Sequence, residues 1–135
     1  MKKIRSYRIE TFNGVERWPS ELELFEVGHS IQLIYRSSKT CLSAKHNYYF
    51  FALAEIRRKL EGVNCLLLCN GSRIDVYPSG MSAIGTLAYE IIYGKRASKL
   101  VEIFETPRSS SQIATVVEQR NYWLGWLRSV STSHS

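Results

Sequence analysis

Two Asn-Gly dipeptides, Asn13-Gly14 and Asn70-Gly71, each separate two short runs that are rich in β-branched and aromatic residues. Asn-Gly is a strong signal for a tight hairpin, because both residues accept the positive φ that a two-residue turn requires. The first dipeptide predicts a hairpin in which a strand over Ile4–Phe12 is followed by a returning strand over Val15–Trp18. Pro19 is expected to end that second strand, since proline cannot donate to a sheet ladder.

The second dipeptide predicts another hairpin. Asn64–Cys69 is a short apolar run, consistent with a strand that is buried on both faces. Arg73–Tyr77 then alternates polar and apolar residues up to Pro78, which is typical of a returning strand. Further strands are expected over Ser30–Tyr35 and Leu100–Phe104, whereas Leu22–Val27 fits a helix and a strand equally well.

The clearest helix is predicted over Asn47–Gly62, where apolar residues form a broad face. Asn47 is expected to cap its start, because an asparagine side chain can accept from the free N–H groups there. Gly62 is expected to end it with a positive φ. Apolar residues at spacings of three and four predict two more helices, over Met81–Gly94 and Gln112–Val130.

Strands joined by hairpins, without regular strand–helix alternation, indicate the α+β class. The predicted architecture is a largely antiparallel sheet built from hairpins and packed against three helices. A chain of 135 residues, 44% of them hydrophobic, forms one domain of ordinary size. We therefore expect a single domain over residues 1–135, with a frayed tail at about 131–135.

The net charge of +6 is spread evenly along the chain, and no basic arm stands out. The densest basic cluster, Arg57-Arg58-Lys59, lies at the end of the predicted helix, where cations are favoured by the helix dipole. This distribution argues against nucleic acid as the main partner. Charged residues interrupt the first ten positions, where a signal peptide needs apolar ones, so we expect a cytoplasmic protein without membrane contact.

The sequence offers no reactive cluster. The histidines, His29, His46 and His134, are not spaced with other ligands as a zinc site requires. The pair Glu102 and Glu105 is expected to be solvated, and neither a phosphate loop nor a nucleophile elbow occurs. We therefore expect no enzyme activity, no catalytic residue, no metal, no cofactor and no small-molecule ligand. Cys65 and Cys69, four apart, are expected to be buried hydrophobic residues in place of a redox pair.

The aromatic residues are the stronger functional signal. Four of them run consecutively over Tyr48–Phe51, and they cannot all face one core from a helix. Trp123 and Trp126 lie three apart on the last predicted helix. Tyr and Trp dominate the energetics of protein interfaces, so Tyr48 and Trp126 are candidate partner-binding residues. The alternative is that the tryptophans only pack the helix onto the core.

The segment from residue 60 to 105 carries a family resemblance. The residues that carry it are Asn70-Gly71-Ser72-Arg73-Ile74-Asp75-Val76-Tyr77-Pro78-Ser79-Gly80-Met81, then Gly85, Ala88-Tyr89, Gly94-Lys95 and Leu100–Phe104. This pattern resembles the immunity proteins of contact-dependent growth inhibition and related polymorphic toxin systems of bacteria. The pattern consists of turn residues, glycines and a proline at the ends of predicted elements, and it contains no catalytic signature.

The resemblance implies a cytoplasmic protein that binds the C-terminal domain of a cognate toxin and blocks its active site. Contacts are then expected from Arg73, Asp75 and Tyr77, which share one face of the predicted strand. Arg73 and Asp75 can instead pair with each other. Immunity proteins of basic nucleases tend to be acidic; this chain is basic, so the toxin surface it contacts is expected to be acidic or mixed.

Two alternatives stay open. A basic nucleic-acid-binding protein would use exposed aromatic residues to stack bases, with Lys and Arg on phosphates. A small hydrolase would need a site assembled from distant residues such as Ser79 or Cys41, and this is the least favoured class.

Overall fold

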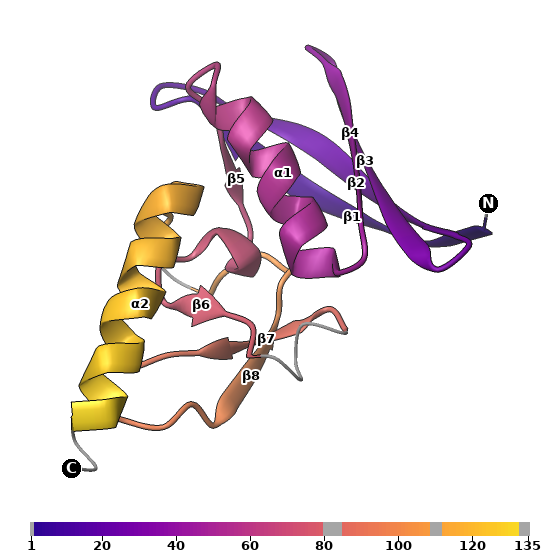
Figure 1. The fold of residues 1–135 in the computed structure, drawn as a ribbon. Helices are drawn as coiled ribbons and strands as arrows, with labels where there is room; N and C mark the ends of the chain where they lie inside the picture. Colours follow the sequence, from indigo (N-terminus) through magenta and orange to yellow (C-terminus); the bar gives the residue numbers. More distant parts are fainter. Residues whose placement is uncertain (1, 80–84, 109–111, 133–135) are drawn as a thin grey trace.

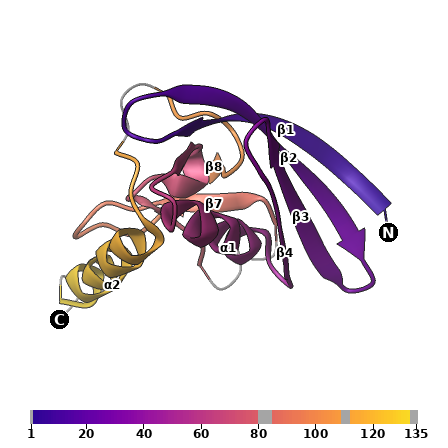
Figure 2. The ribbon, with the colours of Figure 1, turned by 90° about the horizontal axis from the view of Figure 1, so that it is seen from above.

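The computed structural model describes residues 2–79, 85–108 and 112–132. Its larger part is a five-stranded antiparallel sheet in the order β4-β3-β2-β1-β5. Figure 2 shows this sheet curving around helix α1, which lies across its inner face. The sheet and helix elements are β1 (Lys2–Phe12), β2 (Arg17–Val27), β3 (Ser30–Ser37), β4 (Cys41–His46), α1 (Tyr49–Glu61) and β5 (Leu66–Leu68).

The smaller part is a three-stranded sheet beside which helix α2 lies (Figure 1). A single 3-10 turn, η1 (Asn70–Ser72), connects the two parts after β5. The strand order is β6-β7-β8, all antiparallel. The bounds are β6 (Val76–Tyr77), β7 (Leu87–Glu90), β8 (Lys99–Glu102) and α2 (Val116–Thr132).

One hydrophobic core spans both parts. The inner face of the large sheet and the buried face of α1 supply most of it. The small sheet adds Val76 and Ala88, and Ile103 follows directly after β8. Phe104 follows β8 and stacks on Tyr7 of β1 at 5.0 Å between ring centroids. The α+β class and the antiparallel sheet are thus confirmed, while the described residues contain two α-helices where three were predicted.

The predicted helix over Met81–Gly94 is wrong. Residues 80–84 lie outside the described part, but Leu87–Glu90 is a strand that pairs with β6 on one side and β8 on the other. In this segment Ala88 is buried and Leu87 is 43% exposed, so the apolar residues are distributed as on a strand. A short apolar run fits the periodicity of a helix and that of a strand equally well. Here the segment forms a strand because its backbone pairs with β6 and β8.

The second hairpin is also wrong. The strand β5 pairs with β1, through Glu10–Phe12, instead of with the segment after η1. Gly71 is buried in η1, and its N–H donates to the Ile103 carbonyl at 2.8 Å. This bond turns the chain toward the small sheet, where β6 finds its partner in β7.

The first hairpin forms, but its loop runs from Asn13 to Glu16 and its second strand begins at Arg17, where a two-residue turn and a strand from Val15 were predicted. That strand also does not end at proline. β2 continues through Pro19, which lies opposite Glu10 of β1. β3 pairs with β2 only from Ser20 onward, so Pro19 has no described neighbouring strand on that side. A residue without an N–H is tolerated at such a position. The ambiguous segment Leu22–Val27 is a strand, and β4 is a strand that the sequence did not predict.

Helix α1 is confirmed with different ends. The cap position is Tyr48, without a side-chain cap bond, and not Asn47. Gly62 has a right-handed φ of −61°, and the positive φ of 61° falls on Asn64 instead. α2 extends through Ser131 and Thr132, which were expected to fray; residues 133–135 lie outside the described part.

A capping box begins α2. The Thr115 N–H donates to the Glu118 carboxylate at 2.9 Å, and the Glu118 N–H donates to the Thr115 hydroxyl at 3.2 Å. The backbone bond from Thr115 is the main reason that the pKa of Glu118 is lowered. A carboxyl with a lowered pKa stabilises the folded state above its unfolded pKa, and this contribution is lost as pH falls.

Glu118→Gln keeps a side-chain acceptor but removes this titration. We expect the parent protein to lose more stability than the variant between about pH 6 and pH 3. The expected difference is about 0.3–1 kcal/mol, the range for a carboxylate at a helix N-terminus. Urea unfolding at several pH values measures it. Parallel pH profiles for the two proteins would contradict the role given to Glu118.

None of the helices in the described residues is long and apolar enough to cross a membrane.

Candidate functional site

Aromatic rings from three separate elements form a continuous series on one side of the molecule. Tyr48 precedes α1 and contacts Phe51 at 6.3 Å between centroids, and Phe51 contacts Tyr77 of β6 at 6.4 Å. Tyr77 in turn stacks on Trp123 of α2 at 4.5 Å, with the rings 15° from parallel. We call these four residues the aromatic track. It brings together side chains that are far apart in the sequence.

His46, the last residue of β4, holds the first member of the track. Its Nδ1 accepts a hydrogen bond from the Tyr48 N–H at 3.1 Å, and its ring lies 5.6 Å from that of Phe51. Tyr48 itself is 40% exposed. The sequence analysis excluded His46 only as a zinc ligand, whereas the structure makes it a residue that positions Tyr48.

A hollow of about 270 Å³ adjoins the track between α2 and the small sheet. Trp126 lines it, and the Trp126 indole N–H donates to the Lys95 carbonyl at 2.9 Å. This bond and one from the Gly94 N–H to Ser129 at 2.9 Å fasten the segment after β7 to α2. We call this the α2 hollow; its other lining residues are Tyr77, Pro78, Ser79, Tyr89, Ile91, Ala97, Trp123 and Leu127.

Two exposed arginines flank the track. Arg120 and Arg58 both act to lower the pKa of Tyr77, although burial has the larger effect and raises the pKa of this phenol overall. Neither arginine takes part in a salt bridge within the described residues. Their guanidinium groups are therefore available to an acceptor from outside.

Helix α2 also carries exposed apolar side chains. Val117, Leu124 and Leu127 are 66%, 38% and 40% exposed. Soluble monomers rarely leave contiguous apolar surface uncovered unless it binds something. Aromatic rings, arginines and exposed aliphatic residues together are the composition of a protein interface.

The structure separates the five candidate residues of the sequence into two groups. Tyr48 and Tyr77 belong to the aromatic track, and Trp126 lines the adjacent α2 hollow. Arg73 and Asp75 are elsewhere engaged: Arg73 Nη2 lies 2.8 Å from the Asp75 carboxylate.

A second carboxylate holds the same arginine. Glu90 of β7 lies 2.8 Å from Arg73 Nη2, and the Arg73 side chain is only 11% exposed. Burial is the largest single influence on the pKa of Arg73 and lowers it, but the hydrogen bonds and charges of Asp75 and Glu90 together outweigh burial, and the pKa is raised overall. The alternative in which Arg73 and Asp75 pair with each other is therefore what the structure shows, and their role is to join β6 to β7.

Glu102 is less exposed than the sequence suggested. Its Oε2 accepts from the Thr86 hydroxyl at 2.8 Å, and its buried Oε1 has no partner among the described residues. Asn70 binds the Glu102 carbonyl at 3.0 Å through its side-chain amide. These groups lie beside the Arg73 cluster, in a polar hollow of about 440 Å³. Nothing in the sequence around Glu102 indicates that this glutamate is partly buried.

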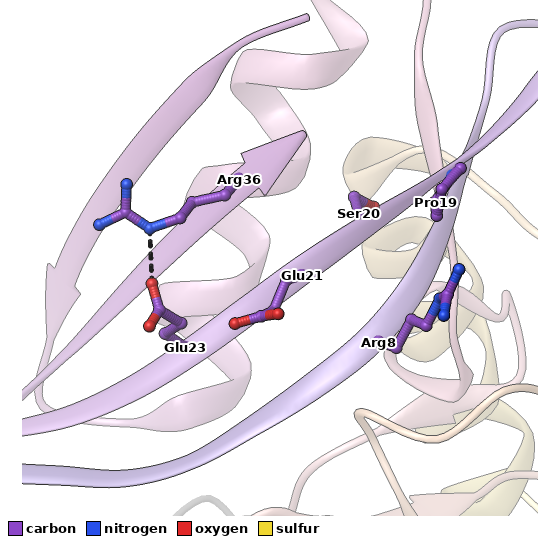
Figure 3. A pocket seen from close by; sticks show the side chains of 6 residues that line it. All are labelled: Arg8, Pro19, Ser20, Glu21, Glu23 and Arg36. Carbon is purple, nitrogen blue, oxygen red and sulfur yellow. Dashed lines mark hydrogen bonds and ion pairs between the residues drawn. The ribbon is translucent and has the colours of Figure 1, made fainter. Parts of the chain in front are cut away.

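The outer face of the large sheet has a charged hollow of about 420 Å³, drawn in Figure 3. Arg36 reaches across to Glu23 at 2.6 Å, and Lys3 approaches the same carboxylate at 2.9 Å. The bond from Arg36 is the main reason that the pKa of Glu23 is lowered. Because Glu23 is already paired with Arg36 and Lys3, we place the candidate site on the aromatic track.

The described residues contain no group of three or more His, Cys, Asp or Glu side chains that could hold a metal ion. Cys65 and Cys69 are buried, as expected, and Cys41 is exposed. Burial raises the pKa of the Cys69 thiol.

Neither the protein-family models nor the curated proteins provide a match to this chain. The function is therefore inferred from the sequence pattern and from the geometry of the surface.

Proposed function

We propose that this chain is an immunity protein, which binds a cognate bacterial toxin domain in the cytoplasm and covers the active site of that domain. The observation that carries the proposal is the aromatic track, flanked by Arg58 and Arg120, beside the α2 hollow. The resemblance of residues 60–105 to immunity proteins supports the same reading.

The rigidity of this surface favours binding. Tyr77 is held between Phe50, at 5.1 Å, and Trp123, at 4.5 Å between ring centroids. Rings that are already ordered lose little conformational entropy when a partner covers them. The α2 hollow offers space for an apolar side chain of the partner, as the pockets at interface centres do.

The positive charge of the surface indicates the charge expected on the toxin surface that contacts it. Arg58 and Arg120 are unpaired in the described part of the chain, and the whole protein carries a net charge of +6. Complementary charge accelerates association and excludes wrong partners. We therefore propose that the toxin contributes an acidic or mixed surface, and that inhibition is steric, without chemistry by this protein.

Nucleic acid is the second candidate partner, because stacked rings beside arginines also suit single-stranded bases. Binding to phosphates must weaken steeply as salt rises. A salt titration with single- and double-stranded oligonucleotides separates the two readings. Absence of binding at low salt removes nucleic acid, whereas tight and salt-sensitive binding would replace the immunity proposal.

Tyr48→Ala tests the proposed interface. We expect the variant to bind its cognate toxin domain roughly tenfold more weakly, the loss typical of a moderate interface residue. The matched control is Val15→Ala, which truncates an 87% exposed residue at the β1–β2 turn and is expected to leave the affinity unchanged.

Co-expression with the toxin gives the biological readout. The parent protein and Val15→Ala are expected to protect cells and to co-purify with the toxin domain. Death of cells that carry the parent protein, with no complex isolated, would reject the proposed function. Equal affinities of Tyr48→Ala and Val15→Ala would reject the aromatic track as the interface.

A further inference from the structure

A fourth hollow lies at the opposite end of α1 from Tyr48, between the helix and the large sheet. It has a volume of about 400 Å³ and is lined by both layers. The apolar part of the lining comes from Trp18, Tyr35, Leu42, Leu60, Val63 and Cys65. Lys39 and Lys59 contribute the cationic part. Apolar walls beside convergent cations are the ordinary composition of a small-molecule site.

Trp18 has an unfulfilled hydrogen bond. Its indole Nε1 is buried and has no acceptor among the described residues. A buried donor without an acceptor costs about 1–3 kcal/mol of stability, which is why such groups are rare in folded proteins. The environment of Trp18 therefore favours an external acceptor at this point.

Lys39 covers the indole ring of Trp18. The Lys39 Nζ lies 4.0 Å from the ring centroid, while its ion pair with Glu16 is long at 3.8 Å. The Lys39 side chain is 51% exposed, so this pair holds it weakly. The Lys39 ammonium group therefore lies beside the indole and is weakly held, so that it can turn toward an anion in the hollow.

Lys59 stands on the other wall of the hollow. Its Nζ donates to the Ser43 carbonyl at 2.7 Å, which orients the ammonium group and leaves two of its three protons free. Within the described residues, no carboxylate forms a salt bridge with Lys59. The hollow therefore presents two cations and one indole donor against apolar walls.

We propose that this hollow binds a small amphipathic anion, a carboxylate carried on an apolar chain or ring. The carboxylate would accept from the Trp18 indole and pair with Lys39 and Lys59, while the apolar body would lie against Leu42, Leu60 and Val63. This proposal is independent of the proposed immunity function, because the hollow and the aromatic track share no residue. It also departs from the expectation, based on the sequence, of no small-molecule ligand.

Octanoate is the probe, and the indole N–H signals of the intact protein in a proton–nitrogen correlation spectrum are the readout. Loss of one signal on Trp123→Phe and of another on Trp126→Phe assigns the third to Trp18. We expect octanoate to shift the Trp18 signal saturably and to leave that of Trp126, which is bonded to Lys95, in place. Octanol, which has no charge, is expected to bind about tenfold more weakly.

Lys39→Glu should weaken octanoate binding about tenfold or more, since it replaces a favourable charge with a repulsive one. Lys45→Glu makes the same change of charge at an exposed position of β4 that does not line the hollow, and should change the affinity less than twofold. An unchanged Trp18 signal at millimolar octanoate, equal binding of octanol, or equal effects of the two variants would each overturn the proposal.

Discussion

Replacing Arg57 with methionine is expected to destabilise the protein by about 2–6 kcal/mol, because two buried oxygens lose their donor. Arg57 is 2% exposed. Its Nη1 donates to Gln119 Oε1 at 2.6 Å and its Nη2 donates to the Ala114 carbonyl at 2.9 Å. In the variant both acceptors stay buried without these bonds, and each costs about 1–3 kcal/mol.

The loss is large because Arg57 joins three elements. From α1 it also donates to the Gly71 carbonyl of η1 at 3.0 Å, while Gln119 belongs to α2. Gln119 extends the same network through its amide, which donates to the carbonyls of Gly71, Arg73 and Val76. Burial lowers the pKa of the Arg57 guanidinium, which shows that this group is removed from water in the folded protein.

Urea unfolding followed by circular dichroism measures the effect, and Arg58→Met is the matched control. Arg58 is the next residue but is exposed, so its replacement is expected to change stability by less than about 0.5 kcal/mol. Equal stabilities of the two variants would contradict the role of Arg57. Because α2 carries Trp123 and Trp126, we also expect Arg57→Met to weaken toxin binding, whereas Arg58→Met affects binding alone.

Gly71→Ala is expected to cost about 1–3 kcal/mol, the range for an added group in a packed core. A Cβ at this position would lie 2.5 Å from Leu53 Cδ2 and 3.2 Å from both Cβ and the carbonyl oxygen of Ile103. Leu53 is itself fully buried and the Ile103 carbonyl accepts the Gly71 N–H, so neither neighbour can retreat freely. The two parts of the fold meet at this residue.

Gly62→Ala is the control for Gly71→Ala. Gly62 ends α1 with a right-handed φ of −61°, and an added Cβ would come no nearer than 3.4 Å to the Lys59 carbonyl. We expect this change to be neutral or to stabilise by up to about 1 kcal/mol, since alanine reduces the freedom of the unfolded chain. Thermal unfolding of both variants measures the contrast, and a Gly71→Ala protein as stable as the parent would refute the close packing.

The elements that the sequence predicted correctly are those with strong local causes. Helix α1 has an apolar face that runs from Phe50 to Leu60, and Asn13-Gly14 lies between two runs of strand-forming residues. The sequence failed where an apolar segment is short, as at Leu87–Glu90, because such a segment carries both helix and strand periodicity. The same ambiguity concealed β4, whose buried Ala44 alternates with exposed Ser43 and Lys45.

The candidate site likewise combines features that the sequence could predict with features that only the tertiary structure shows. The side-chain chemistry of Tyr48 and Trp126 was enough to make them candidates for partner binding, and the family resemblance added Tyr77. The sequence could not indicate the stacking partner Trp123, the positioning residue His46, or the capture of Arg73 by Glu90. These contacts depend on the tertiary structure, in which β5 pairs with β1 and β6 pairs with β7.

Local chemistry thus determined the helices α1 and α2, the first hairpin and the residue types of the binding surface. The tertiary structure alone decided which strands pair, and with them which distant side chains meet. The physical reason is that helices and hairpins depend on neighbours within a few residues, whereas strand pairing brings together residues far apart in the chain, as do the bonds from Arg57 and Gln119 to the Gly71 carbonyl.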